Sequence, residues 1–222
     1  MNTQPMPIRI DFVSDVVCPW CAIGLVSLEQ ALQRLQGTVA AELHFQPFEL
    51  DPNMPAAGMD VADNLKCKYG MGDAQLAENQ DRIRARGEEL GFSFDFNARS
   101  RTWNTFDAHR LLHWAEGEDR QRELKHALLQ ANFSEGRNVS DRDTLVEIAA
   151  GVGLDAARAA AILASDEYAA EVRAAEEFFR KLGISGVPAI IIERKHLISG
   201  GQPVEVFERA LREIAASTAA QE

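Results

Sequence analysis

Cysteine is scarce in this chain of 222 residues, which contains only three, so a framework of disulfide bonds cannot be what holds it together. Basic residues are also outnumbered, since 23 Lys and Arg face 34 Asp and Glu and the formal net charge is −11. A chain of this charge is repelled by phosphate backbones and by anionic lipid surfaces, so we expect neither a nucleic acid nor a membrane as a partner. No apolar run approaches the ~20 residues that a membrane-spanning helix needs.

The apolar fraction of 46% and the charged fraction of 26% are ordinary for a globular protein with an apolar core. The length fits one large domain, or one domain that carries an inserted second unit. The first residues, MNTQPMPIRIDFVSDVVCPWC, have neither the basic start nor the apolar stretch of a secretory signal, which predicts a cytoplasmic protein. In that reducing compartment, neighbouring cysteines are more often redox-active or metal-binding than structural.

Segments with the alternation or the β-branched content of strands lie near both ends of the chain. We predict strands at Ile8–Val13, Glu42–Leu50, Val187–Glu193 and His196–Ser199. Apolar residues at helical spacing predict helices at Pro19–Leu35, Val61–Tyr69, Asp73–Leu90, Asn104–Glu116, Arg120–Phe133, Arg142–Gly151, Asp155–Ala164, Glu167–Leu182 and Val204–Ala215. This order predicts one α/β sheet built from distant parts of the chain, with the helical block inserted into it.

The most informative pattern is a pair of cysteines, Cys18 and Cys21, between the first strand and the first helix. Pro19 suits the first helical turn because its missing N–H has no intrahelical partner there, which makes Cys18 the N-cap and puts Cys21 one turn later. The free N–H groups of that turn and the helix dipole stabilise a thiolate, so we predict Cys18 as the nucleophile. Cys21, inside the helix, is then the thiol that resolves the mixed disulfide.

Other interpretations of the pair stay open at this point. Cys18 and Cys21 have the spacing of zinc ligands, but a structural zinc site needs two more, and Cys67 and His44 are isolated in the sequence. The cysteines also fit as small, inert core residues, and a semi-buried lone thiol is the simplest interpretation of Cys67. The strand–CxxC–helix context favours redox chemistry, so we expect no metal and no cofactor other than a redox-active disulfide. Asp15 opposes thiolate formation if it lies near Cys18.

Further motifs accompany the cysteine pair. The set is Ser14–Cys21 (SDVVCPWC), Asn104–Thr105 with Ala108–Leu111, Gly183–Pro188 (GISGVP) and Ser199–Pro203 (SGGQP). In this order, over residues 8–215, the set resembles the thioredoxin-fold proteins of the DsbA family. Within that family it is most similar to the FrnE-like branch, which is related to 2-hydroxychromene-2-carboxylate isomerases and kappa-class glutathione transferases.

The resemblance implies an α/β, thioredoxin-like fold with a large all-helical insertion between its βαβ and ββα halves. Residues 1–55 and 183–222 form the thioredoxin-like domain in this interpretation, and residues 56–182 form the inserted helical domain.

The resemblance also implies roles for individual residues. Cys18 matches the attacking cysteine of the family and Cys21 the resolving cysteine. Pro188 matches a cis-proline that faces the disulfide, and the backbone of the preceding residue, Val187, pairs with an extended substrate strand. The glutathione-using relatives keep a serine or a single nucleophile at the position of Cys18, so the presence of two cysteines favours dithiol–disulfide chemistry.

Four other residues are candidates for contact with the substrate. Pro19 and Trp20 lie between the two cysteines. His109 lies in the segment NTFDAHRLLHW, which fits either a substrate surface over the CxxC pair or an ordinary amphipathic core helix. Gln202 lies in the turn before the last helix, a region that can be near the ligand in the glutathione-binding relatives.

The sequence therefore predicts a cytoplasmic thiol–disulfide oxidoreductase or isomerase that acts on a disulfide-containing protein or a small-molecule thiol. The alternative is a glutathione-dependent isomerase or transferase for an aromatic or polyketide-like compound, with glutathione as its ligand. A non-catalytic binding or chaperone module with incidental thiols is a third hypothesis. The sequence is compatible with a homodimer but does not require one.

Overall fold

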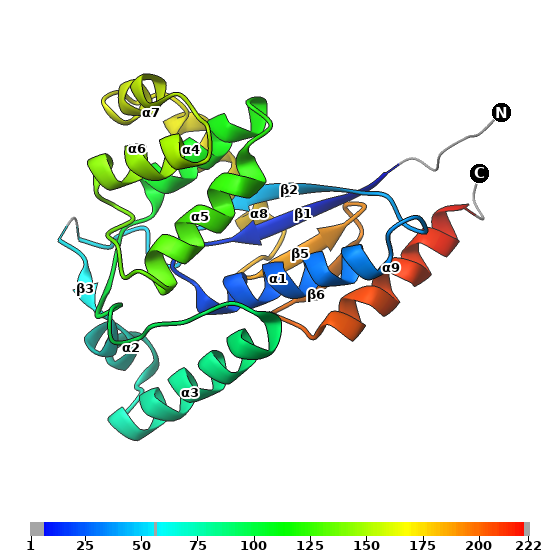
Figure 1. Cartoon of the computed structure of the whole chain (residues 1–222), viewed down its shortest axis with the longest axis horizontal. Helices are drawn as coiled ribbons and strands as arrows, with labels where there is room; N and C mark the ends of the chain where they lie inside the picture. Colours follow the sequence, from blue (N-terminus) through cyan, green and yellow to red (C-terminus); the bar gives the residue numbers. More distant parts are fainter. Residues whose placement is uncertain (1–6, 56, 220–222) are drawn as a thin grey trace.

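The computed structural model describes residues 7–55 and 57–219 and is built around a four-stranded sheet (Figure 1). The strands of this sheet are β1 (Ile8–Ser14), β2 (Ala41–Pro47), β5 (Ala189–Ile192) and β6 (His196–Ser199). Their spatial order is β2-β1-β5-β6, with β1 parallel to β2 and the other neighbours antiparallel. Strands from both ends of the chain therefore meet in one sheet, which confirms the predicted α/β architecture.

The helices follow the predicted order, with ends that differ by a few residues. They are α1 (Pro19–Arg34), α2 (Val61–Tyr69), α3 (Asp73–Leu90), α4 (Phe106–Gly117), α5 (Gln121–Phe133), α6 (Arg142–Gly151), α7 (Ala156–Leu163), α8 (Ala169–Lys181) and α9 (Val204–Ala219). The strand predicted to reach Leu50 ends at Pro47, which lacks the N–H that a ladder needs. A short ribbon of β3 (Met59–Asp60) and β4 (Arg101–Thr102) was not predicted.

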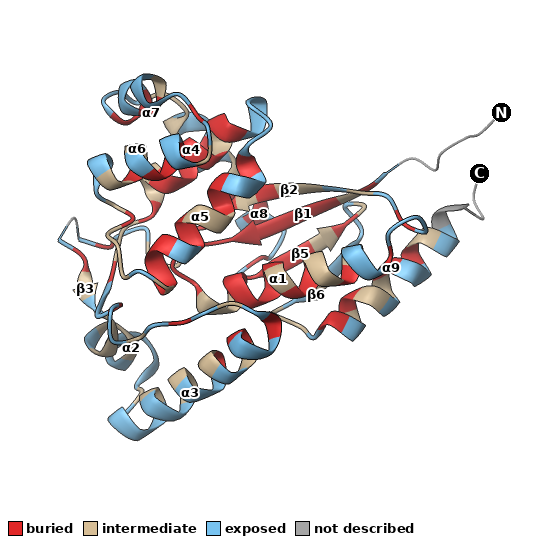
Figure 2. Ribbon diagram, in the orientation of Figure 1, coloured by how far each residue is buried: buried red, intermediate tan, exposed pale blue. Residues whose placement is uncertain are grey.

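One apolar core lies between the sheet and helices α1 and α9, where Figure 2 shows buried residues along the facing sides. Ile10 and Phe12 of the central strand β1 are fully buried in it, and Phe207 of α9 packs there too. Ile83 of α3 and Phe133 of α5 join this same core. Part of the helical block therefore packs on the sheet layer, and the division of the chain at residues 55 and 183 stays a prediction.

A second apolar core lies among helices α4 to α7, in the upper left of Figure 1. Val16 and Val17, which directly precede Cys18, belong to this second core. Ala22 and Ile23, which directly follow Cys21, belong to the first. The CxxC segment is therefore fixed at the junction between the two cores, with buried neighbours on both sides in the sequence.

Two glycines let other segments approach the start of α1 closely. A Cβ placed on Gly24 would lie 3.0 Å from Cγ of Pro188 and 3.3 Å from Cα of Gly201. A Cβ placed on Gly201 would lie only 2.8 Å from the carbonyl oxygen of Trp20. Packing therefore explains the glycine at position 201, because the SGGQP turn rests on the backbone of the CPWC helix and leaves no room for a side chain.

Gly201→Ala is expected to lower the free energy of unfolding by about 1–3 kcal/mol, because the methyl group forces the turn away from α1. Urea unfolding followed by circular dichroism measures the loss. Gly151→Ala is the matched control, since nothing lies within 4 Å of a Cβ at that helical position and its stability should be unchanged or slightly raised. Equal stability of the two variants would contradict the close approach.

Candidate active site

Cys18 is the N-cap residue of α1, and Pro19 stands in the first helical turn. The backbone of Cys18 is extended (φ −92°, ψ 113°), and no side chain caps the first-turn N–H groups. Its thiol donates a hydrogen bond to the carbonyl oxygen of Val187, with an S···O distance of 3.6 Å. The Cys18 side chain is therefore placed at the positive end of the helix and next to the loop that leads into β5, as predicted.

The two cysteines are free thiols whose pKa values are shifted in opposite directions. A hydrogen bond from the Cys21 thiol is the main cause that lowers the pKa of Cys18, and it outweighs the burial that raises it. The charge of Asp15 also raises the pKa of Cys18, as the sequence position suggested. Burial raises the pKa of Cys21 well above that of an ordinary thiol. The thiolate therefore forms first on Cys18.

Buried charges lie behind the dithiol. Asp15 is fully buried, and one of its carboxylate oxygens accepts a hydrogen bond of 2.8 Å from the backbone N–H of Leu50. The other lies 3.4 Å from Nε2 of His109. Burial raises the pKa of Asp15, but the neighbouring His109 reverses this and the net pKa is lowered. Lys125 of α5 is also buried, which lowers its pKa, while the charges of Cys21 and Asp15 raise it.

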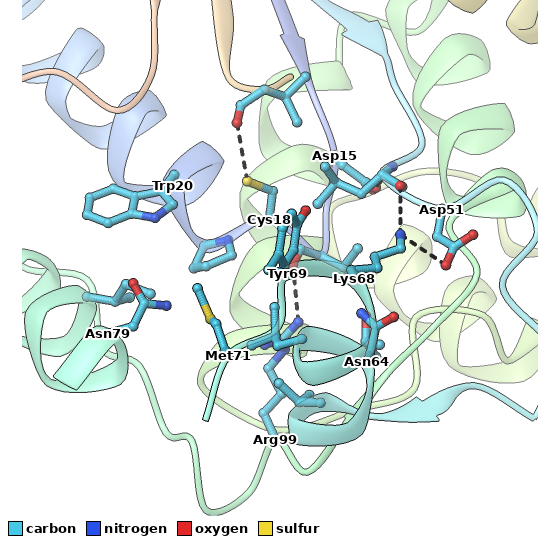
Figure 3. Close-up of a pocket in the computed structure, with 18 of the residues that line it drawn as sticks. Asp15, Cys18, Trp20, Asp51, Asn64, Lys68, Tyr69, Met71, Asn79 and Arg99 are labelled. Carbon is cyan, nitrogen blue, oxygen red and sulfur yellow. Dashed lines mark hydrogen bonds and ion pairs between the residues drawn. The ribbon is translucent and has the colours of Figure 1, made fainter. Parts of the chain in front are cut away.

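A cavity of about 520 Å³ opens beside Cys18, and we call it the Cys18 cavity (Figure 3). Its walls come from the CPWC segment, the chain after β2, helices α2 and α3, the segment that contains Arg99, and the loop before β5. Its lining includes Asp15, Cys18, Pro19, Trp20, Asp51, Lys68, Met71, Arg82, Phe96, Arg99, Trp103 and Val187. Cys18 lines this cavity and Cys21, which is fully buried, does not.

The structure brings together some of the predicted site residues. Cys18, Pro19, Trp20 and Val187 all line the cavity. The Val187–Pro188 peptide bond is cis, in agreement with the implication of the family resemblance. The first segment of the chain and the loop before β5 thus contribute to one site, although they are far apart in the sequence.

Other predicted residues lie elsewhere. His109 is only 2% exposed and lies behind Asp15, not on the cavity wall, because α4 buries this face against the loop after β1. The side-chain amide of Gln202 donates to the carbonyl oxygen of Ser199 at 2.8 Å and closes its own turn outside the cavity lining. Cys67 is exposed on α2, so the expectation of a semi-buried thiol was wrong: no residue of α2 is buried.

Sequence reasoning missed the far wall of the cavity. Arg99 lies in an irregular segment after α3, and Lys68 and Met71 lie in or just after α2. No motif marks these residues, since only tertiary packing brings them to the cavity that Cys18 lines. Within residues 7–55 and 57–219, no group of three or more His, Cys, Asp or Glu side chains is placed to hold a metal ion. In the same part of the chain, no helix is long and apolar enough to cross a membrane.

A dithiol at the N-terminus of the helix that follows a central strand, facing the loop that carries a cis-proline, defines a protein of the thioredoxin fold. Comparison with known proteins makes this assignment specific. Residues 9–212 match the model of the DSBA-like thioredoxin domain, and the chain therefore belongs to that family.

Solved structures agree with this assignment. The crystal structure of the probable DsbA oxidoreductase SCO1869 from Streptomyces coelicolor is 38% identical, covers 95% of this chain and 90% of its own, and superposes with a TM-score of 0.88. The cytosolic disulfide reductase DsbM from Pseudomonas aeruginosa, solved with GSH, is 19% identical, with a TM-score of 0.62 over 96% of this chain and 99% of its own. A 2-hydroxychromene-2-carboxylate isomerase is 13% identical, with a TM-score of 0.66 over 96% and 99%. At these lower identities the last two proteins show the shared fold alone.

Proposed function

We propose that this protein is a thiol–disulfide oxidoreductase in which Cys18 attacks a substrate disulfide and Cys21 resolves the mixed disulfide. The observation that carries the proposal is the division of roles within the pair. Cys18 reaches the cavity and has a lowered pKa, whereas Cys21 is fully buried and has a raised pKa. A low-pKa thiol that borders a cavity, beside a fully buried partner, is an arrangement that favours thiol–disulfide exchange.

The reaction proceeds in two exchanges. The Cys18 thiolate attacks one sulfur of the substrate disulfide RS–SR, so a Cys18–SR bond forms and RS⁻ leaves. The Cys21 thiolate then attacks the Cys18 sulfur, the Cys18–Cys21 disulfide forms, and the second RS⁻ leaves. The protons released by the two cysteines end on the two product thiols. The protein dithiol loses two electrons and the substrate disulfide gains them, and the reverse sequence oxidises a substrate dithiol.

The substrates that we propose are disulfide-containing proteins or small-molecule thiols, and we place the reaction in the cytoplasm. The carbonyl group of Val187, which accepts a hydrogen bond from Cys18, lies at the site where an extended substrate segment would pair with the backbone. A cytosolic disulfide reductase that shares the fold, DsbM, is compatible with this location.

A glutathione-dependent isomerase or transferase remains the second candidate function. The observation that favours it is the cavity itself, because about 520 Å³ lies within the range of small-molecule sites and Trp20, Phe96 and Trp103 line it. One relative in fold was solved with GSH and another is an isomerase. This candidate predicts a turnover that depends on glutathione and survives in Cys21→Ser, whereas the oxidoreductase loses its complete cycle in that variant.

An insulin-reduction assay with dithiothreitol tests the proposed function. The wild-type protein is expected to accelerate reduction, and Cys18→Ser is expected to fall to the uncatalysed rate because its nucleophile is gone. Cys67→Ser is the matched control, since Cys67 is exposed on α2 and is not among the lining residues, and it should retain full activity. Undiminished activity of Cys18→Ser would show that the dithiol is not the catalyst.

A further inference from the structure

Arg99 is a buried cation on the wall of the Cys18 cavity, and its backbone is held firmly. Its residue exposure is 8%. Asp95 builds the turn before it, with its carboxylate accepting hydrogen bonds from the N–H groups of Asn97 and Ala98 at 2.9 Å each. The N–H of Arg99 itself donates to the carbonyl oxygen of Asp95 at 3.0 Å. The guanidinium lies 4.6 Å from the centre of the Phe133 ring, so packing restricts the side chain as well.

The hydrogen-bonding capacity of Arg99 is largely unused. A guanidinium carries five N–H donors, but within the described residues the only bond of this group is from Nη2 to the carbonyl oxygen of Val17, at 3.1 Å. Its Nε is buried and has no hydrogen-bond partner there. Burial lowers the pKa of Arg99 to about 10, so the group stays charged at neutral pH. A buried cation with free donors is a receptor for an anionic oxygen, and Val17 directly precedes the reactive Cys18.

While Cys18 is a thiol, the lining cations Lys68, Arg82 and Arg99 outnumber the lining carboxylates Asp15 and Asp51. Nζ of Lys68 lies 3.0 Å from a carboxylate oxygen of Asp51, so these two charges are matched. Asp15 accepts a backbone hydrogen bond and faces His109 behind the site, and its charge also favours the charged form of Arg99. Arg82 lies over the Trp20 ring at 5.3 Å, and in the described part of the chain neither Arg82 nor Arg99 forms an ion pair. A cationic cavity in a chain of net charge −11 concentrates anions locally.

We propose that the Cys18 cavity selects small organic disulfides that carry a carboxylate close to the reacting sulfur, and that Arg99 binds this carboxylate. The inference rests on the proposed function of Cys18. The guanidinium supplies paired donors for the carboxylate oxygens, while Trp20, Met71 and Phe96 provide an apolar surface for the carbon chain. Because Arg99 is bonded to the carbonyl group of Val17, which directly precedes the attacking cysteine, a bound carboxylate holds the neighbouring disulfide near the Cys18 sulfur.

Three disulfides with the same two-carbon arms and different end groups test this inference. They are dithiodipropionate (anionic), hydroxyethyl disulfide (neutral) and cystamine (cationic). The reduced protein is mixed with each one, without added reductant, and the first exchange is followed by tryptophan fluorescence and mass spectrometry. Each rate is divided by the rate of the same disulfide with free dithiothreitol, which removes its intrinsic reactivity. We expect the normalised rate for dithiodipropionate to exceed that for cystamine by about tenfold or more.

Substitutions of Arg99 test whether this residue causes the preference for the anionic disulfide. In Arg99→Gln the three normalised rates should become similar, and Arg99→Lys should retain part of the preference because it keeps the charge but loses the paired donors. Arg86→Gln is the matched control. Arg86 lies on α3, as lining residues of the cavity do, but it pairs with Glu89 at 2.6 Å and is not a lining residue, so the preference should be unchanged.

The outcomes separate the inference from the proposed function. Equal normalised rates for the three disulfides in the wild-type protein overturn the carboxylate selection and leave the role of Cys18 intact. A preference that persists in a folded Arg99→Gln overturns the assignment to Arg99. Failure of the wild-type protein to react with any of them overturns the inference alone if the insulin assay shows activity, and overturns the proposed function as well if that assay shows none. The wild-type series decides the selection even where the Gln variant does not fold.

Discussion

Cys21→Ser is expected to carry out the first exchange and then stop, so that the substrate accumulates as a mixed disulfide on Cys18. The attacking sulfur still lines the cavity in this variant, but the only thiol placed to resolve it has been removed. Turnover in the insulin assay should fall to the background rate. Intact-mass spectrometry should show the protein plus one substrate arm, and added dithiothreitol should release it.

Cys21→Ala is the matched partner of this variant and separates the two roles of Cys21. The hydrogen bond from the Cys21 thiol is the main cause of the lowered pKa of Cys18. A serine hydroxyl can still donate such a bond, whereas alanine cannot. Without that donor the thiolate is less stable, so the pKa of Cys18 rises and the first exchange should need a higher pH in Cys21→Ala than in Cys21→Ser.

The pH profile of iodoacetamide alkylation measures this difference directly. The midpoint for Cys18 should lie below that of an ordinary thiol, about 8.5, in the wild-type protein and in Cys21→Ser, and it should move upward in Cys21→Ala. Identical midpoints in the two variants would contradict the hydrogen bond as the cause. Continued turnover of both variants without a trapped adduct would instead favour the single-thiol, glutathione-dependent candidate.

The start of the fold and its site could be predicted from the sequence because the signals are local. The apolar run before Cys18 is typical of a central strand, which is buried on both faces in the structure. Pro19 fixes the start of α1, and the spacing of Cys18 and Cys21 then follows from helix geometry. The meeting of both chain ends in one sheet also followed from the order of strands and helices.

The far wall of the cavity and the charges behind the dithiol could not be predicted, because they depend on how the inserted helices pack. Arg99 stands in a segment without regular structure, and its contact with Val17 joins residues that are 82 positions apart in the sequence. His109 lies in a segment with the apolar spacing of an amphipathic helix. That spacing does not reveal that the buried partner of His109 is Asp15. Lys125 looks like a residue of a solvated helix face in the sequence, yet it is 1% exposed.

The charge of Lys125 is expected to assist the second exchange. Burial raises the pKa of Cys21, which keeps this residue a thiol at neutral pH, but resolution of the mixed disulfide requires its thiolate. The charge of Lys125 acts in the opposite direction and favours the thiolate of Cys21. Among the charges that raise the pKa of Lys125, that of Cys21 comes first, ahead of Asp15 and Cys18. The ammonium group and the thiolate of Cys21 therefore stabilise each other.

Lys125→Met is expected to slow the second exchange and to leave the first nearly unchanged. Methionine has a similar shape but no charge, so the pKa of Cys21 should rise further, and the thiolate fraction falls about tenfold for each unit of that rise. The mixed disulfide should therefore persist longer at neutral pH, as quenched-flow mass spectrometry can measure. Stability should change little, because the cost of burying the ammonium group is removed and Asp15 keeps its contact with His109.

The pH dependence of this variant distinguishes an electrostatic role from a structural one. If Lys125 acts through the pKa of Cys21, raising the pH restores the thiolate, so the second exchange in Lys125→Met should approach the wild-type rate in alkaline solution. Lys181→Met removes an exposed lysine that pairs with Glu177 on α8 at 3.2 Å, and both exchanges should be unaffected. If the second exchange in Lys125→Met is slow at every pH, Lys125 only supports the packing of α5. If it proceeds at the wild-type rate at neutral pH, burial and Cys18 alone set the reactivity of Cys21.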